Sequence, residues 1–505
     1  MNFLAFWRKP KSKGSSSEQP DKTSSEFLAM DLYSQVAYMA GIAAAGLPRN
    51  KIFEYAARLP YCTSVYFKRV QFMARKLNYN YAEACRVVGD GTKEPDPKAL
   101  LLRMSGSLTS GESETAFLQR EALVMGEHYS DEYERKVESL RKWADAYSSL
   151  ILSSAIIVTV GIVSMLIYPV SPLFIMTLSA LVVCVSAAGP WLLYTSAPRE
   201  LKTHCLSEKS KEQVLAASLF RICIPAAVAV CAILATLSVD LGWVMIAGAT
   251  LLLPPGVVIL HDDRKIEKRD SDIHMFLRSL GSVTKAIGTN ITDGMNRLDM
   301  RFVGSLRPSV KRLQGALGAG VKPDLCWWRF IAENGSELVK RSTHMFWDGV
   351  RFGGDPHEVG RASSEYAMKM SLLRGKRSLV AGSFTWLCVA MHTCICGLLV
   401  LIYEIMIGFS SAIEGIEVEG AEVLGRMPSF GLFNASAQIH LLRIMVITII
   451  LVQVGANAFA IKSVEGGHEY KLVFYLAVLL AIAGLCLVLV PEVSSTVFSS
   501  LPEMA

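Results

Sequence analysis

Long uncharged apolar runs constrain this chain more than any other feature. The longest, from Ala146 to Ala197, holds 52 residues without a charge. A helix crosses the hydrocarbon core of a bilayer with about 20 apolar residues, so this run accommodates two crossings around a proline-containing turn at 168–172. Further apolar runs follow at 222–239, 241–260, 378–403, 444–461 and 472–490. The sequence therefore predicts seven membrane-spanning helices.

The composition excludes several classes of protein. Hydrophobic residues make up 51% of the chain and charged residues only 19%, against about 25% charged in soluble domains, which excludes a soluble enzyme and a disordered protein. A net charge of +6 is too small an excess to indicate nucleic-acid binding. The eleven cysteines are scattered, several of them inside apolar runs, so we expect reduced, structural thiols.

The distribution of lysine and arginine predicts the orientation. Residues 1–147 and 262–377 each carry 21 basic residues, and seven alternating spans place both segments on one side. Because basic loops stay cytoplasmic, we predict a multi-pass protein of the cell membrane with a cytoplasmic N-terminus and an external C-terminus. Asn434 begins the only glycosylation pattern that is then external, and chance also explains so short a pattern.

The two polar segments lack the alternating pattern of strands, and apolar residues recur at helical spacing, as at Leu32, Val36 and Met39. We predict an all-α polytopic membrane protein with about seven transmembrane helices and two repeated cytoplasmic helical bundles. The expected divisions are a disordered cytoplasmic tail (1–25), a cytoplasmic helical domain (26–147), four transmembrane helices in two hairpins (148–261), a second cytoplasmic helical domain (262–377), a transmembrane helix (378–407), an external acidic loop (408–441), two transmembrane helices (442–490) and an external tail (491–505).

The second polar segment resembles the first at a nearly constant distance along the chain. Three landmarks recur 242 or 243 residues later: Ala45-Gly46 as Ile287-Gly288, Ser110-Gly111-Glu112 as Gly353-Gly354-Asp355, and Trp143 as Trp386. A shared offset indicates an internal duplication of a helical domain together with the membrane helix that follows it.

One of these landmarks is a glycine–acid turn between helices, and its two copies are Gly111-Glu112 and Gly354-Asp355. Glycine permits a tight turn, and an acid suits the start of a helix, so helix capping alone accounts for the residue types. The alternative is a partner-binding tip that occurs twice.

A helix dense in both charges, 117–142, follows the first turn and leads directly into the first span. It contains Glu134 and Arg135, and Trp143 follows it. Such a coupling helix transmits movement from the cytoplasm to the membrane, although a charged helix is more often merely a solvated face.

The second polar segment is the more basic, with 21 basic and 14 acidic residues, and a basic surface docks readily on an acidic partner. Three of its basic residues lie beside the fifth span: Arg374, Lys376 and Arg377. Membrane topology and anionic lipid head groups account for the same three residues without a protein partner.

The chain lacks the residue patterns that catalysis requires. The nearest approach to a nucleotide-binding P-loop is Gly375-Lys376-Arg377-Ser378, and Met370 stands where the first glycine belongs. His204 and Cys205 are adjacent and do not face each other on a helix. Cys394 and Cys396 point apart. We therefore predict no enzymatic activity, catalytic residue, cofactor or metal, so energy must come from a partner.

The tandem helical segments resemble the F-domain of the platform proteins of type II secretion and type IV pili, and most closely the membrane platform of the archaellum. The stretches that carry the resemblance, within about residues 27–480, are Leu108–Glu112, Phe117-Leu118, Tyr133-Glu134-Arg135, Trp143–Tyr147, Phe276–Ser282, Arg297-Leu298-Asp299, Glu333–Val339, Gly353–Pro356 and Glu358-Val359-Gly360. This sequence has more membrane spans than the bacterial branch of the family, which favours a resemblance to the archaeal branch.

The resemblance implies a platform without chemistry of its own, set among membrane lipids beneath a growing filament. It implies a cytoplasmic hexameric secretion ATPase and pilin-like filament subunits as partners, and a homodimer as the assembly. The candidate contacts with the ATPase are Gly111, Glu112, Gly354, Asp355, Arg374, Lys376 and Arg377. A platform of a related adhesion pilus or of a type II secretion machine is the alternative.

A polytopic transporter is the main alternative of another class, since transporters place ionisable groups within their spans. Such groups are few here: His392 within the fifth span and Glu404 at its end. Gln453 and Asn457 lie four residues apart in the sixth span and so share one helix face. We predict that they pack against a neighbouring span or face a groove used by a filament subunit.

Overall fold

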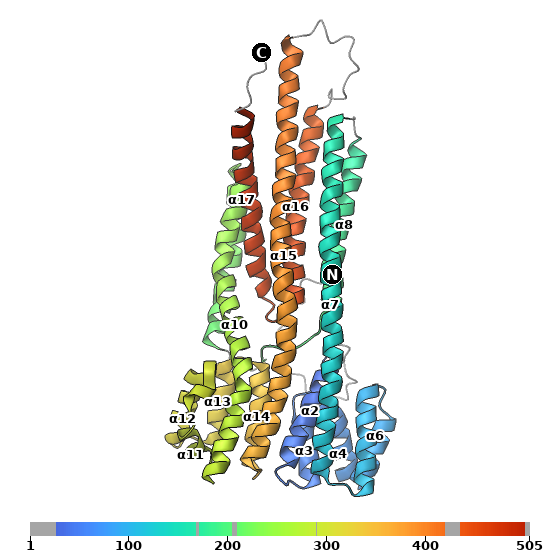
Figure 1. Ribbon diagram of the computed structural model, residues 1–505, viewed down its shortest axis with the longest axis vertical. Coiled ribbons are helices and arrows are strands. Elements are labelled where there is room, and N and C mark those ends of the chain that lie inside the picture. The colour runs from blue at the N-terminus through green and yellow to red at the C-terminus, as the bar shows by residue number, and fades with distance from the viewer. Residues whose placement is uncertain (1–26, 168–170, 205–209, 289, 420–434, 500–505) are drawn as a thin grey trace.

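The computed structural model describes residues 27–167, 171–204, 210–288, 290–419 and 435–499. Within these ranges the regular structure is helical, apart from one isolated bridge between Thr203 and Ser336. The molecule is elongated (Figure 1), with long helices at one end, here called the apolar bundle, and short helices at the other, the polar end. The all-α prediction is confirmed. The tail 1–25 and the pattern at Asn434 lie outside the described residues.

The apolar bundle contains the helices predicted to span the membrane. Within the described residues, seven helices are long and apolar enough to do so: α7 (Glu114–Ile167), α8 (Pro172–Ser196), α9 (Lys211–Thr236), α10 (Leu241–Ile287), α15 (Pro356–Glu419), α16 (Ala435–Glu465) and α17 (Lys471–Ser499). The predicted number of spans is confirmed, and the chain is an all-α polytopic membrane protein.

Three helices, α7, α10 and α15, run from the polar end into the apolar bundle without interruption (Figure 1). The predicted divisions after residues 147, 261 and 377 therefore fall inside continuous helices. At about 1.5 Å per residue, the 54 residues of α7 extend for roughly 80 Å. Each of these three helices is therefore shared by the polar end and the apolar bundle.

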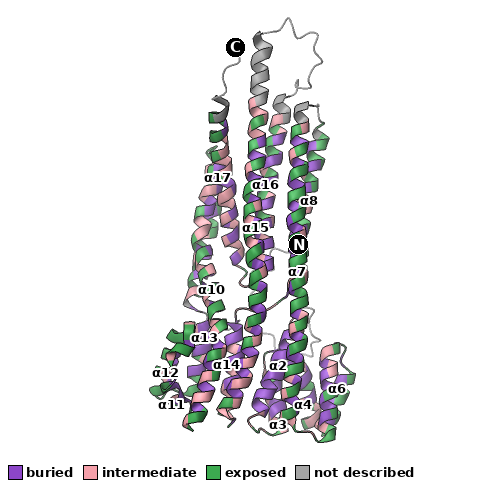
Figure 2. Cartoon of the chain, in the orientation of Figure 1, coloured by how far each residue is buried: buried purple, intermediate pink, exposed green. Residues whose placement is uncertain are grey.

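The polar end is built from short helices around α2 (Leu28–Ala43). The others are α3 (Arg49–Arg58), α4 (Ser64–Lys76), α5 (Tyr81–Asp90), α6 (Pro95–Ser110), α11 (Ile291–Asn296), η2 (Met300–Leu306), α12 (Arg307–Gly318), α13 (Pro323–Asn334) and α14 (Glu337–Arg351). Nearly all of α2 is buried (Figure 2), since it packs against α7, α14 and α15. One hydrophobic core thus contains residues from both polar segments.

Helix boundaries in the polar end recur at the spacing noticed in the sequence. The first residues of four helices are each followed 242 positions later by the first residue of another: Arg49 by Ile291, Tyr81 by Pro323, Pro95 by Glu337, and Glu114 by Pro356. This regularity supports an internal duplication. Superposition of the two halves is the test, and the duplication stays a prediction.

Candidate functional site: the junction of the polar end and the apolar bundle

The first predicted tip, Gly111-Glu112, joins α6 to α7. Gly111 has a φ of 75°, a left-handed conformation that favours glycine. Glu112 accepts a hydrogen bond from the Ser107 hydroxyl at 2.9 Å and forms an ion pair with Arg120 at 2.8 Å. The carboxylate is therefore already satisfied within the chain, as a structural turn requires.

The second predicted tip, Gly354-Asp355, joins α14 to α15. A side chain at Gly354 would approach the Gly349 carbonyl oxygen to 2.7 Å, so the packing requires glycine there. Asp355 accepts a hydrogen bond from the His357 backbone N–H at 3.0 Å and pairs with Lys285. The hydrogen bond from Lys285 is the main cause that lowers the pKa of Asp355 below its ordinary value. A role of either tip in partner binding stays a prediction.

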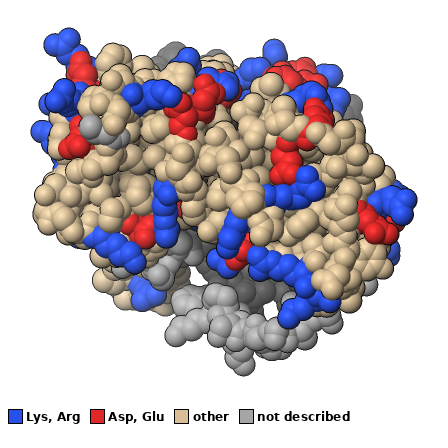
Figure 3. Space-filling view, turned by 90° about the horizontal axis from the view of Figure 1, so that it is seen from below, with Lys and Arg blue, Asp and Glu red and all other residues tan. Residues whose placement is uncertain are grey.

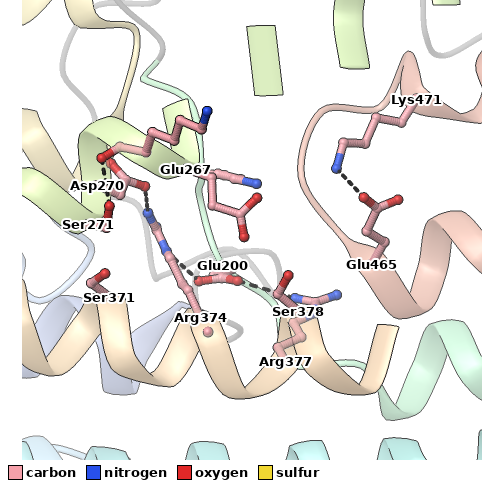
Figure 4. A pocket seen from close by; sticks show the side chains of 13 residues that line it. Glu200, Glu267, Asp270, Ser271, Ser371, Arg374, Arg377, Ser378, Glu465 and Lys471 are labelled. Atoms are coloured by element: carbon pink, nitrogen blue, oxygen red, sulfur yellow. Dashed lines mark hydrogen bonds and ion pairs between the residues drawn. The ribbon is translucent and has the colours of Figure 1, made fainter. Parts of the chain in front are cut away.

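Arg374 and Arg377, predicted as contacts for the ATPase, are instead buried on α15. Arg374 pairs with Glu200 at 2.9 Å and with Asp270 of α10 (Figure 4). Arg377 also reaches Glu200, at 3.4 Å, and donates to the backbone oxygens of Pro198 and Val464 at 2.8 and 3.0 Å. Both guanidinium groups are held inside the chain, so the prediction of an exposed contact is wrong for these two residues.

A second set of buried charges lies beside the first. Lys471, at the start of α17, pairs with Asp263 of α10 and, at 2.9 Å, with Glu465 at the end of α16. Lys202, in the segment after α8, also pairs with Asp263, at 2.8 Å. Together these eight residues form what we call the junction cluster: Glu200, Lys202, Asp263, Asp270, Arg374, Arg377, Glu465 and Lys471.

The junction cluster holds four acids and four bases, which matters because a buried charge is costly unless it is paired. Burial alone would raise the pKa of Glu200, but Arg374 and Arg377 outweigh it and hold that pKa below its ordinary value. The cluster borders a cavity of about 240 Å³. It ties α10 and α15 to the segment after α8 and to the connection between α16 and α17, and so fastens the polar end to the apolar bundle.

Sequence reasoning missed the acids of the junction cluster. A signal was present, since Asp263 and Glu200 each stand three residues after the end of an apolar run. Cytoplasmic membrane edges favour basic residues, and an acid at such an edge indicates a specific partner. The partners themselves lie far away in sequence, 174 residues in the case of Glu200 and Arg374.

The coupling helix lies in α7 and contacts α15 through two ion pairs. Glu134 pairs with Lys376 at 2.6 Å and Glu127 pairs with Lys369 at 2.6 Å. Lys376, unlike its buried neighbours, is exposed, as are Arg135 and Trp143 on α7. These contacts join the charged part of α7 to the charged part of α15.

Gln453 and Asn457 are buried on one face of α16. Asn457 accepts a hydrogen bond from the Tyr147 hydroxyl of α7 at 2.8 Å, and its side-chain nitrogen lies 3.2 Å from Nδ1 of His392 on α15. The Oε1 atom of Gln453 has no hydrogen-bond partner among the described residues. Asn457 thus connects three helices at the level where α7 enters the bundle.

In the part of the chain that the structure describes, no three side chains of His, Cys, Asp or Glu lie close enough together to bind a metal ion. Asn434, the possible glycosylation site, lies outside that part.

Comparison with known proteins gives two archaeal relatives named Flagella accessory protein J. The one from Methanocaldococcus jannaschii is 25% identical over 321 residues, which cover 61% of this chain and 57% of that protein. The one from Methanococcus voltae is 19% identical over 448 residues, which cover 86% of this chain and 79% of that protein. The first match thus spans little more than half of the relative's length.

No family model and no solved structure matches the chain, so the broader resemblance to the F-domain of secretion platforms stays a prediction. The chain is similar to archaeal proteins named Flagella accessory protein J, which confirms the resemblance to the membrane platform of the archaellum predicted from its sequence.

Proposed function

We propose that this chain is a non-enzymatic platform in the cell membrane that couples a cytoplasmic secretion-type ATPase to the assembly of an archaellum or a similar filament. The names of its relatives support a flagellar accessory role. The observation that carries the mechanism is the junction cluster, because it fastens the polar end to the helices of the apolar bundle. Movement of the polar end then displaces α7, α10 and α15 together, and with them the surface offered to pilin-like subunits.

We place the polar end and the N-terminus in the cytoplasm and the C-terminus outside. The excess of basic residues in the polar segments and their scarcity between the outer ends of the spans support this orientation. In this orientation the polar end is the part of the chain that a cytoplasmic ATPase reaches.

The surface that best fits an ATPase is a group of basic side chains on the second polar segment, which we call the basic edge: Arg297, Arg301, Arg307 and Lys311. All four are exposed, and the structure gives their side chains no ion pair within the described residues. They belong to the region of α11, η2 and α12, which lies at the end of the molecule away from the apolar bundle (Figure 1). Lipid head groups are therefore out of reach.

The basic side chains of the basic edge have no ion-pair partner among the described residues, whereas the acids of the two tips are paired. Seen from the polar end, many basic side chains lie beside acidic ones (Figure 3), as Lys285 lies beside Asp355. Residues paired in this way offer little net charge to a partner, whereas the basic edge attracts an acidic surface and speeds association. Phe302, exposed on η2, supplies an apolar contact within it.

The test is binding of the purified full-length chain to the hexameric secretion ATPase of the same cell. Reversing two charges, in R307E with K311E, is expected to weaken binding at least tenfold, and the affinity of the wild type is expected to fall as salt is added. K68E with R69E makes the same charge change at exposed, unpaired residues of α4 and is expected to leave binding within twofold.

Two results would count against the proposal. Binding unchanged in R307E with K311E rejects the basic edge. Weakening by E112K with D355K would instead assign the contact to the tips. If the wild type binds no secretion ATPase at all, the platform function itself is wrong.

A further inference from the structure

The cavity beside the junction cluster has room for a ligand. Its volume is about 240 Å³, and a single water molecule needs only about 10–15 Å³. Seven of its 13 lining residues belong to the junction cluster (Figure 4). The other six lie on the two helices that face each other across the cavity: Glu267, Lys268 and Ser271 on α10, and Ser371, Gly375 and Ser378 on α15.

Four of these six residues carry polar groups that the chain itself does not use. Glu267 and Lys268 are exposed and form no ion pair within the described residues. The hydroxyl groups of Ser371 and Ser378 make no hydrogen bond there either, whereas Ser383 of the same helix donates to the Val380 backbone oxygen at 3.0 Å. The cavity therefore offers a ligand one acid, one base and two hydroxyl groups.

Arg374 adds hydrogen-bond donors to this set. Its guanidinium donates to Glu200, to Asp270 and to the Leu201 carbonyl oxygen, which uses three of its five N–H groups. Two N–H groups are left for a molecule in the cavity. The acids and bases of the junction cluster balance each other, so a ligand with a net charge would bring a charge without a partner. A ligand with one positive and one negative group fits this balance.

The position of the cavity along α15 indicates where such a ligand comes from. Ser371, Gly375 and Ser378 extend for about 10 Å along the helix, and the apolar run 378–403 begins at the last of them. The head-group layer of a bilayer covers about 5–8 Å on each side of the hydrocarbon, so the cavity reaches into this layer. Leu379, the next residue, is exposed by 78% and offers an apolar surface to lipid tails.

We propose that the cavity binds the head group of a zwitterionic membrane lipid, a phosphodiester that carries a primary amine. The phosphate accepts hydrogen bonds from Lys268, from the free N–H groups of Arg374 and from the serine hydroxyls, since charged donors bind such oxygens strongly. The ammonium group pairs with Glu267. A lipid held in this way contacts α10 and α15 together and adds to the contacts of the junction cluster. This inference goes beyond the proposed function, which concerns an ATPase.

The first test compares two lipids that share the phosphodiester. The purified full-length chain in detergent is titrated with phosphatidylethanolamine or with phosphatidylglycerol, which lacks the amine, and bound lipid is counted by native mass spectrometry. The wild type is expected to bind phosphatidylethanolamine at least tenfold more tightly. E267Q should lose this preference, and K268Q should weaken binding of both lipids about tenfold. R278Q removes an exposed, unpaired charge elsewhere on α10 and should leave both affinities within twofold.

The second test fills the cavity without disturbing the packing of the helix. A side chain added at Gly375 or at Gly382 would meet nothing within 4 Å, but only Gly375 lines the cavity. G375L is therefore expected to weaken binding of phosphatidylethanolamine at least tenfold, whereas G382L should leave it within twofold. Both variants add the same side chain to the same helix, so a general effect of leucine would appear in both.

Three results would overturn the proposal. The first is a wild type without preference for phosphatidylethanolamine, and the second is equal binding in G375L and the wild type. The third concerns the source of the head group. Soluble glycerophosphoethanolamine has no tails and is expected to bind at least tenfold more weakly than the lipid, so equally tight binding would show that the ligand is not a lipid. None of these measurements requires the ATPase, so ATPase binding stays a separate question.

Discussion

Replacing Arg374 by alanine is expected to destabilise the protein by about 3–5 kcal/mol, the usual cost of removing one partner from a buried ion pair. The substitution leaves Glu200 and Asp270 buried without the guanidinium that pairs with both. It also removes the hydrogen bond to the Leu201 carbonyl oxygen, 2.9 Å away. The check is the midpoint of thermal unfolding of the purified chain in detergent.

The matched control for Arg374 is Lys376, two residues further along the same helix. Its ion pair with Glu134 is exposed at both partners, and exposed pairs contribute only about 0–1 kcal/mol. K376A should therefore unfold close to the wild type. Equal effects of R374A and K376A would show that the junction cluster does not hold the polar end to the apolar bundle.

Lowering the pH should reduce the difference in unfolding stability between R374A and the wild type. In the wild type the pKa of Glu200 lies below its ordinary value, so its charge contributes stability at neutral pH that is lost as the pH falls through that lowered pKa. In R374A the carboxyl has lost its main partner and becomes protonated at a higher pH. If the stability difference between the two proteins stays constant as the pH is lowered to the ordinary pKa of a glutamate, Glu200 does not depend on Arg374 as its main partner.

Replacing Arg341 by methionine is the second change with a large expected effect, again about 3–5 kcal/mol. Arg341 of α14 pairs with Asp31 of α2 at 2.8 Å and with Glu337 at 3.0 Å, and all three are buried. It also donates to the Ser34 hydroxyl at 2.8 Å. These contacts join the first polar segment to the second, so R341M should weaken the contact between them as well as lower the unfolding midpoint.

Two comparisons separate charge burial from simple loss of packing at Arg341. R351M removes an exposed arginine from the same helix, paired with Asp324 at 2.9 Å, and should cost less than about 1 kcal/mol. Neutralising the two acids as well, in D31N with E337Q and R341M, should recover much of the loss, because a buried neutral group needs no counter-charge. No recovery would point to lost packing over the Tyr61 ring instead.

Hydropathy and helical spacing predict the fold class and the number of spans, because both depend on neighbouring residues. The same local signal predicts a domain boundary where the hydropathy changes, but the helices α7, α10 and α15 continue through these predicted boundaries. A sequence pattern does not show whether a helix stops where its surroundings change from water to lipid.

The candidate site depends on contacts across long sequence distances, and this is where sequence reasoning fails. The sequence places Arg374 and Arg377 in a basic segment and so among the candidate contacts with a partner. The acids that pair with Arg374 come from α10 and from the segment after α8. The four-residue spacing of Gln453 and Asn457 does predict a shared helix face. Their neighbour Tyr147, 310 residues from Asn457, becomes visible only in three dimensions.

The central claim is that both polar segments lie on the cytoplasmic side, where an ATPase can act on them. Labelling E112C and D355C with a membrane-impermeant maleimide tests it directly, with the wild type as the baseline for native thiols such as Cys184 and Cys394, which are exposed in the apolar bundle. We expect both introduced thiols to react in inverted vesicles and neither to react in intact cells. Reaction of either from the outside of intact cells would contradict the account.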